Sequence, residues 1–216
     1  MLAAVLAALI EIQIAGLLNI FAGNYLSIVP FAIFIFLVYQ FLLVALVEEL
    51  SKYLIVKEKV VNDPEFDEPV DTMLYMIIIA LGFAALENIL YLLPTRKLLF
   101  FSEILRMTVA ISFLRFIGAT FLHALCSGTL GYFLALSFFE TKKRSKLILK
   151  GVIMATVLHA LYNISIIGVE TSYKLKNYII FSVALVSVAA ILIGLAVFVL
   201  FGFRKLKKIA SVCKLH

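Results

Sequence analysis

Charged residues are scarce in this chain, and their scarcity excludes an ordinary soluble fold. Only 15% of the 216 residues are charged, whereas 64% are hydrophobic. A typical soluble domain is about 25% charged and about 45–50% apolar. A water-soluble fold of this length could not bury so much apolar surface, and the polar stretches are too short for a separate soluble domain. We therefore predict a single membrane domain over residues 1–216.

Cysteine is also rare, and the few basic residues are unevenly placed. Cys126 and Cys213 provide neither a disulfide framework nor the ligand spacing of a zinc motif. The net charge of +6 comes largely from "TKKRSKLILK" and "FRKLKK", which flank apolar segments. This pattern is typical of the cytoplasmic loops of membrane proteins and argues against binding to nucleic acid. The N-terminus lacks the basic region of a cleavable signal peptide, so we interpret it as a retained first span.

The hydrophobic runs predict an all-α fold, a polytopic transmembrane helical bundle. A span needs about 20 apolar residues, and it is helical because lipid offers no partner to an unpaired backbone group. Residues 98–115 carry Glu103, Arg106 and Arg115, which are costly in lipid, so we interpret them as an interfacial or re-entrant helix. We expect about six spans in addition, at residues 2–22, 30–56, 71–93, 116–139, 147–169 and 178–203.

The distribution of basic residues predicts the topology. With six spans, twelve basic residues lie on one side, namely Lys57, Lys59, five within 142–150 and five within 204–214. Four lie on the other side, within 96–97 and 174–176. Because basic residues are enriched on the cytoplasmic side, both termini are expected in the cytoplasm of a multi-pass protein of the cell membrane. If residues 98–115 also crossed, the basic clusters would stay inside and the N-terminus would lie outside.

Four successive predicted spans contain polar residues that lipid does not tolerate well. A charge at mid-bilayer costs about 2.5–3.5 kcal/mol on insertion scales, so such residues usually face one another inside a bundle. These residues are Glu48, Glu49 and Lys52 in "LVALVEELSKYLIV", Glu87 and Asn88 in "LGFAALENILYLL", Arg115 and His123 in "LRFIGATFLHALCSG", and His159 and Asn163 in "TVLHALYNISI".

Helical spacing refines the chemistry of this set. Glu48 and Lys52 share a helix face and are close enough to pair, whereas Glu49 is rotated by about 100°, which gives the two carboxylates different roles. His159 and Asn163 also share a face. The carboxylates and imidazoles offer either a general base or a zinc site with an open water position. Structural alternatives exist for each residue, including an ion pair that fixes helix register and interhelical hydrogen bonds.

These residues also resemble the motifs of a known family, the PrsW intramembrane proteases. "VEELSKYLIV" resembles the EExxK signature of that family, and "FDEPVDTMLYMIIIALGFAALENILYLL" resembles its second block, in which Phe83 and Glu87 form FxxxE. "RFIGATFLH" matches the family's arginine-to-histidine spacing through Arg115 and His123, and "LHALYN" matches its last block. The four blocks occur in the family's order between about Val44 and Ile167, which outlines a catalytic core. Ala160 and Thr72 depart from it, because glycine is common at both positions.

The resemblance implies an endopeptidase that cleaves a membrane-anchored protein such as an anti-sigma factor. The family is distantly similar to the CAAX prenyl proteases. By that similarity Glu48 or Glu49 activates water, Glu87 takes the place of a histidine, and His159 and Asn163 steady the oxyanion. Lys52 and Arg115 support the site. The cofactor is either none or zinc, and in a metalloenzyme the expected ligands are Glu49, Glu87, His123 and His159.

Two other functions use the same residues. A proton- or ion-coupled transporter also carries Glu and His groups at mid-membrane, although we find no internal repeat and no Gly/Pro-broken pair of spans. A non-catalytic membrane scaffold of the same fold is the other alternative. The loss of one glutamate of the pair would have favoured a scaffold, and both Glu48 and Glu49 are present.

Overall fold

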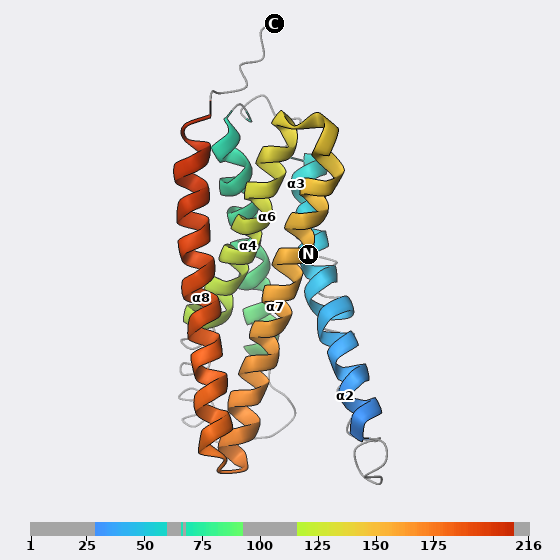
Figure 1. Cartoon of the computed structure of the whole chain (residues 1–216), viewed down its shortest axis with the longest axis vertical. Coiled ribbons are helices and arrows are strands. Elements are labelled where there is room, and N and C mark those ends of the chain that lie inside the picture. Colours follow the sequence, from blue (N-terminus) through green and yellow to red (C-terminus); the bar gives the residue numbers. More distant parts are fainter. Residues whose placement is uncertain (1–28, 60–65, 67, 93–115, 210–216) are drawn as a thin grey trace, which may run out of the picture.

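The computed structural model describes residues 29–59, 66, 68–92 and 116–209, and it is all-α throughout these ranges (Figure 1). Within them, five helices are long and apolar enough to cross a membrane. The elements in chain order are α2 (Val29–Val38), η2 (Tyr39–Ala45), α3 (Leu46–Lys59), α4 (Pro69–Leu92), η3 (Phe116–Thr120), α6 (Phe121–Phe139), η4 (Thr141–Lys143), α7 (Arg144–Lys174) and α8 (Tyr178–Leu206).

The helices confirm the predicted multi-span bundle and refine its boundaries. The spans predicted at 71–93, 116–139 and 178–203 correspond closely to α4, to η3 with α6, and to α8. The helix α7 is longer than the span predicted at 147–169. It continues to Lys174 and so includes most of residues 170–177, which were expected to connect this span to the next one. The predicted first span 2–22, the segment 98–115 and Arg115 lie outside the described residues.

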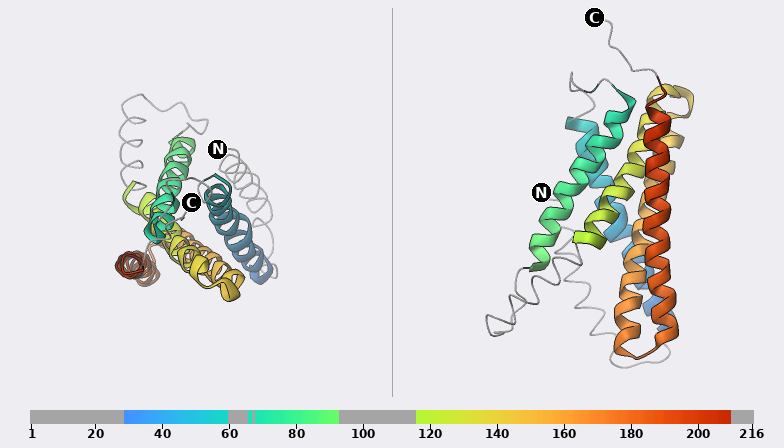
Figure 2. Two further views of the ribbon diagram at one scale, coloured as in Figure 1. Left: turned by 90° about the horizontal axis from the view of Figure 1, so that it is seen from above. Right: turned by 90° about the vertical axis from the view of Figure 1, so that its left-hand side faces the viewer.

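Helix α6 lies at the centre of the bundle and organises the helices around it. In its most hydropathic window 78% of the residues are buried, compared with 28–33% for the spans of α3, α4 and α7 and 11% for α8. It packs against α4, α7 and α8, and Figure 2 shows α8 at the periphery. Helix association in lipid relies on close packing of small residues, and α6 is rich in them from Cys126 to Gly131. A central helix of this kind can hold polar side chains away from lipid.

Gly131 marks the closest approach of α6 to α4. A Cβ atom at this position would lie 2.8 Å from the Met73 Cα and 3.0 Å from the Thr72 carbonyl oxygen, both backbone atoms. We expect Gly131→Ala to lower the free energy of unfolding by about 1–3 kcal/mol, because α4 must move outward. Gly194→Ala in α8 is the matched control, since a Cβ there meets nothing within 4 Å. Unfolding in detergent measures both, and equal stabilities would contradict the close packing.

Two π-helical segments precede residues of the predicted site. η2 ends at Ala45, three residues before Glu48, and η3 ends at Thr120, three residues before His123. A π-helical turn is wider than an α-helical turn, so it rotates every residue that follows it, and such turns are frequent at functional sites. The two segments therefore set the directions in which Glu48 and His123 point.

The geometry at the start of α4 explains the acidic residue in its first turn. Pro69 occupies the first helical position, where its missing N–H is not needed. The Glu68 backbone N–H donates to the Asp71 carboxylate at 2.8 Å, which is the backward half of a capping box. Asp71 therefore acts as a helix cap, which accounts for an acidic residue in the first turn of a span.

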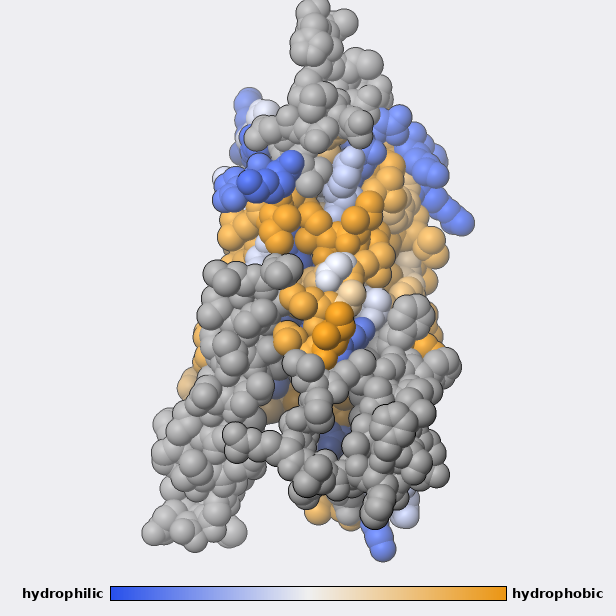
Figure 3. Space-filling model, turned by 180° about the vertical axis from the view of Figure 1, so that it is seen from behind, coloured by the Kyte–Doolittle hydropathy of each residue, from blue (hydrophilic) through white to orange (hydrophobic). Residues whose placement is uncertain are grey.

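The basic residues gather at one end of the bundle. Figure 1 shows that the end of α3, the start of α7 and the end of α8 lie together, so Lys57, Lys59, the 142–150 cluster and Arg204–Lys208 share that end. Figure 3 shows hydrophilic residues at this end and a broad hydrophobic band beneath them. This grouping is the arrangement that the topology prediction requires, since one membrane face must collect these clusters.

Candidate active site

Five buried ionisable side chains meet in the bundle interior. Glu48 and Glu49 are 3% and 0% exposed, Lys52 is 0% exposed, and His123 and His159 are each 2% exposed. They come from α3, α6 and α7, and Glu87 of α4 joins them. Charges at this depth are stable only when they face one another, as the sequence predicted for Glu48, Glu87, His123 and His159. The structure brings these four together.

Glu49 is the anchor of the cluster. Its Oε1 accepts hydrogen bonds from Lys52 Nζ at 2.7 Å and from His159 Nδ1 at 2.9 Å. Its Oε2 accepts one from the Ser127 hydroxyl at 3.2 Å. These three donors lie on α3, α7 and α6, so a single carboxylate joins three helices. A carboxylate that is engaged in this way holds its neighbours in place.

The ion pair predicted between Glu48 and Lys52 is present, but Lys52 makes a shorter one with Glu49. Lys52 Nζ lies 3.9 Å from Glu48 Oε2 but only 2.7 Å from Glu49 Oε1. Residues three apart share a helix face as well as residues four apart do, so spacing alone does not choose between the two carboxylates. Glu49 is the closer partner because its carboxylate turns toward the other donors of the bundle.

His123 is held on both sides of its ring. Nε2 lies 2.7 Å from Glu87 Oε2, and Nδ1 lies 2.8 Å from Lys52 Nζ. The Phe83 ring packs beside it, with its centroid 5.7 Å from the imidazole and 4.7 Å from Lys52 Nζ. Phe83 and Glu87 are four residues apart on α4 and both contact His123. The FxxxE motif therefore acts as a support for this histidine.

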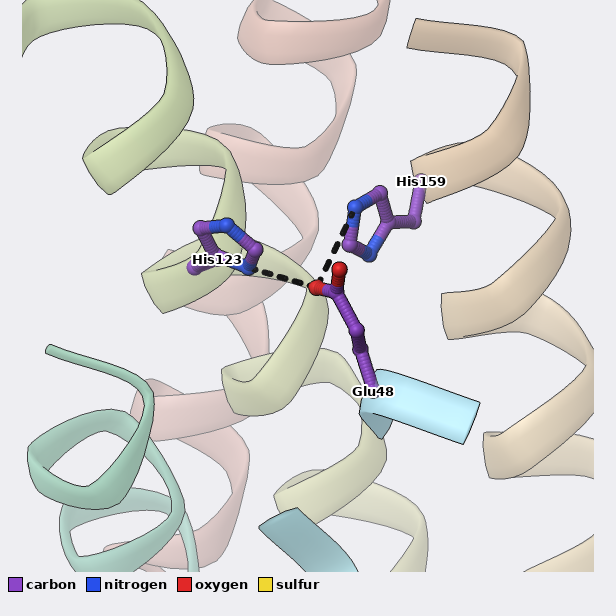
Figure 4. Close-up of side chains that lie close together, drawn as sticks. All are labelled: Glu48, His123 and His159. Atoms are coloured by element: carbon purple, nitrogen blue, oxygen red, sulfur yellow. Dashed lines mark ion pairs between the residues drawn. The ribbon is translucent and has the colours of Figure 1, made fainter. Parts of the chain in front are cut away.

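Glu48 lies between the two histidines (Figure 4). Its Oε2 is 3.8 Å from His123 Nδ1 and 3.8 Å from His159 Nε2. The two imidazole rings meet edge to face, with centroids 5.0 Å apart. Each histidine thus contacts two carboxylates. One ring nitrogen contacts Glu87 in His123 and Glu49 in His159, and the other ring nitrogen faces Glu48.

Hydrogen bonding fixes what these ring nitrogens offer. A carboxylate accepts hydrogen bonds, so the nitrogen of His123 that faces Glu87 and that of His159 that faces Glu49 carry the N–H. In a neutral ring the opposite nitrogen then presents a lone pair. Two nitrogen lone pairs and a carboxylate oxygen are consequently directed into one region of the interior, an arrangement that favours a cation, and the Lys52 ammonium contacts the His123 nitrogen there.

The donor set and its spacing fit a divalent metal ion. One donor atom each from Glu48, His123 and His159 lies within 4.8 Å of the other two. Tetrahedral zinc with bond lengths near 2.1 Å places its ligand atoms about 3.4 Å apart. The two separations from Glu48 Oε2 are 3.8 Å and all three lie within 4.8 Å, so the side chains would have to draw closer together around the ion. This set differs from the predicted ligands Glu49, Glu87, His123 and His159, because Glu49 and Glu87 lie behind the histidines and orient them.

The other residues considered from sequence have different placements. Asn163 is half-buried one turn beyond His159 on α7, and within the described residues no hydrogen bond ties it to the cluster. Asn88 donates to the Thr120 hydroxyl at 3.0 Å and so links α4 to η3. The contact of Ser127 with Glu49 was not predicted from the sequence. The position of Ser127 four residues after His123, on the same helix face, was the available signal.

The comparisons with known proteins agree with the motifs. Residues 1–199 match the family described as PrsW family intramembrane metalloprotease. The chain belongs to the PrsW family. It is 35% identical to a protease PrsW of Geobacillus kaustophilus over 57% of this chain and 49% of that protein. It is 29% identical to the protease PrsW of Bacillus subtilis over 80% of this chain and 67% of that protein.

The overlap with these relatives is partial. A protease PrsW of Clostridioides difficile is 27% identical over 68% of this chain and 58% of that protein. The chain therefore spans about half the length of the curated relatives that it matches first. No solved structure matches it significantly.

Proposed function

We propose that this chain is an intramembrane endopeptidase that hydrolyses a peptide bond in a membrane-anchored protein. The observation that carries the proposal is the arrangement of the two histidines around Glu48. Each is tied by a carboxylate through one ring nitrogen and directs the other toward the Glu48 oxygen at 3.8 Å. Membership of the PrsW family, whose curated members are named proteases, supports the same reaction class.

Glu48, His123 and His159 would hold the metal ion that the family description implies. A zinc ion with two imidazole ligands and one carboxylate ligand supplies Lewis-acid polarisation of a peptide carbonyl and activates water at neutral pH. The donor chemistry is that of catalytic zinc sites, which keep one coordination position open.

The remaining residues position this centre and balance its charge. Glu49 and Glu87 fix the tautomer and orientation of His159 and His123, and such outer carboxylates strengthen imidazole as a ligand. Lys52 offsets one of the buried negative charges. Asn163 is one turn from His159 and remains our candidate for a hydrogen-bond donor to the oxyanion.

The depth of the site points to the membrane face away from the basic end. At 1.5 Å per residue, His123 lies about 24 Å along α6 from Phe139, and His159 lies about 22 Å along α7 from Arg144. The hydrocarbon core is about 30 Å thick, so the centre is at or beyond the midplane. If the basic end is cytoplasmic, cleavage takes place in the outer half of the membrane, where the luminal or extracellular part of an anchored substrate such as an anti-sigma factor enters.

Metal analysis combined with a cleavage assay tests this function. The full chain, in proteoliposomes with single-span membrane proteins, should release a cleaved fragment, contain about one metal ion per chain and lose activity to a strong chelator. Restoration by zinc would support the metal centre. Cleavage that survives metal removal would instead favour a glutamic mechanism with Glu48 as the base. Ion flux that depends on Glu87, without cleavage, would favour the transporter alternative.

The proposed topology makes a separate prediction. With Cys126 and Cys213 replaced by serine, a cysteine introduced at Ser145, in the basic cluster at the start of α7, should resist impermeant thiol reagents in intact cells and react after permeabilisation. Cysteine at Lys176, in the turn between α7 and α8 at the opposite end, is the matched position and should react in intact cells. Reversed labelling of the two positions would invert the orientation and place cleavage in the cytoplasmic half.

A further inference from the structure

Lys52 is the cationic group closest to the proposed metal centre within the described residues. Its ammonium contacts His123 Nδ1 at 2.8 Å and Glu49 Oε1 at 2.7 Å, and it lies 3.9 Å from Glu48 Oε2. The Phe83 ring covers its remaining side at 4.7 Å. The side chain is 0% exposed, so protein groups surround the ammonium.

The contact with His123 has a direct consequence for metal binding. Because Nε2 of His123 faces Glu87, Nδ1 is the nitrogen that offers a lone pair. The same lone pair accepts from Lys52 and would have to bind the metal ion, so the two cations cannot use it together. Glu49 offers Lys52 a second partner at 2.7 Å that does not take part in the Glu48, His123 and His159 donor set.

We propose that Lys52 is an internal cation that competes with the metal ion for His123 and keeps only its contact with Glu49 when metal binds. Without metal the ammonium balances the carboxylates and keeps the donor atoms assembled inside the membrane. With metal, its flexible four-carbon stem allows it to withdraw while it remains paired with Glu49. Lys52 thereby sets how tightly the centre holds its ion, and this inference rests on the proposed metal site.

Metal affinity measured on the full chain tests the competition. In nanodiscs, Lys52→Met should bind Zn²⁺ and Co²⁺ at least about tenfold more tightly than the wild type, because it removes both a competing donor to His123 and a like charge beside the ligands. Lys52→Arg keeps the charge and should bind no more tightly than the wild type. Lys57→Met changes an exposed lysine of the same helix and should leave the affinity unchanged.

A second measurement needs no variant. In wild-type protein with ¹⁵N-labelled lysine side chains, the Lys52 resonance should shift when Zn²⁺ is added, because its contact with His123 is lost. Equal or weaker binding by Lys52→Met, or an unshifted resonance in metal-loaded protein, would overturn the proposed role of Lys52. The proposed metal centre would not be affected by either result. If neither the wild type nor any variant binds Zn²⁺ or Co²⁺, the metal centre of the proposed function fails and this inference fails with it.

Discussion

Replacing Glu48 with Gln should reduce cleavage by about 10²–10⁴-fold while the protein still inserts and folds. Glutamine keeps the volume and can still accept a hydrogen bond, but it has no negative charge. Glu48 Oε2 is the oxygen that lies 3.8 Å from both His123 Nδ1 and His159 Nε2, so this change alters the centre itself. The loss is expected whether Glu48 acts as a base or as a metal ligand. Initial cleavage rates in proteoliposomes measure it.

Two control variants separate chemistry from folding. Glu58→Gln removes an exposed carboxylate from the same helix and should cleave at the wild-type rate. Glu48→Gln should show wild-type helix content and remain monodisperse in detergent. Metal content then divides the two roles, because loss of the ion together with activity indicates a ligand, whereas an unchanged metal content indicates a base. Full cleavage by a Glu48→Gln, Glu49→Gln double variant would refute the protease mechanism altogether.

The spans could be predicted from sequence because lipid permits few alternatives. A segment that crosses it must be helical and apolar for about 20 residues, so hydropathy alone located 116–139 and the other described spans. The same physics predicted the cluster. Glu48, Glu87, His123 and His159 are each too costly to face lipid, and a bundle has only one interior in which they can meet.

The division of roles within the cluster could not be predicted in the same way. Glu48 and Glu49 are adjacent in sequence, and which of them makes the shorter contacts with Lys52 and His159 depends on a rotation of the helix. That rotation follows from the π-helical segment that ends at Ala45, and the sequence contains no pattern that predicts this segment. Glu49 is moreover fixed by Ser127 and His159, which are distant in sequence. Local spacing predicted the Glu48–Lys52 pair, which is present, but it could not show that tertiary contacts make Glu49 the closer partner of Lys52.

Replacing Glu49 with Leu should destabilise the fold more than any other single change in the cluster. The substitution leaves the Lys52 ammonium buried without its closest partner, at 0% exposure, and removes the acceptor of His159 and Ser127. Breaking a buried ion pair from one side typically costs about 3–5 kcal/mol. Reversible unfolding in mixed micelles should show a loss of this size, and activity should fall with it. Glu140→Leu breaks only the exposed pair with Lys143 and should change little.

The double variant Glu49→Leu, Lys52→Met makes this prediction decisive. Both charges are then removed together, and similar cases show that apolar replacements of a buried pair can be close to neutral. The double variant should therefore recover a large part of the stability that Glu49→Leu loses. Activity should not recover, since His159 still lacks the carboxylate that orients it. If the double variant is as unstable as Glu49→Leu, the cost does not come from an uncompensated ammonium. The contacts of Glu49 with Ser127 and His159 would then be what holds α3, α6 and α7 together.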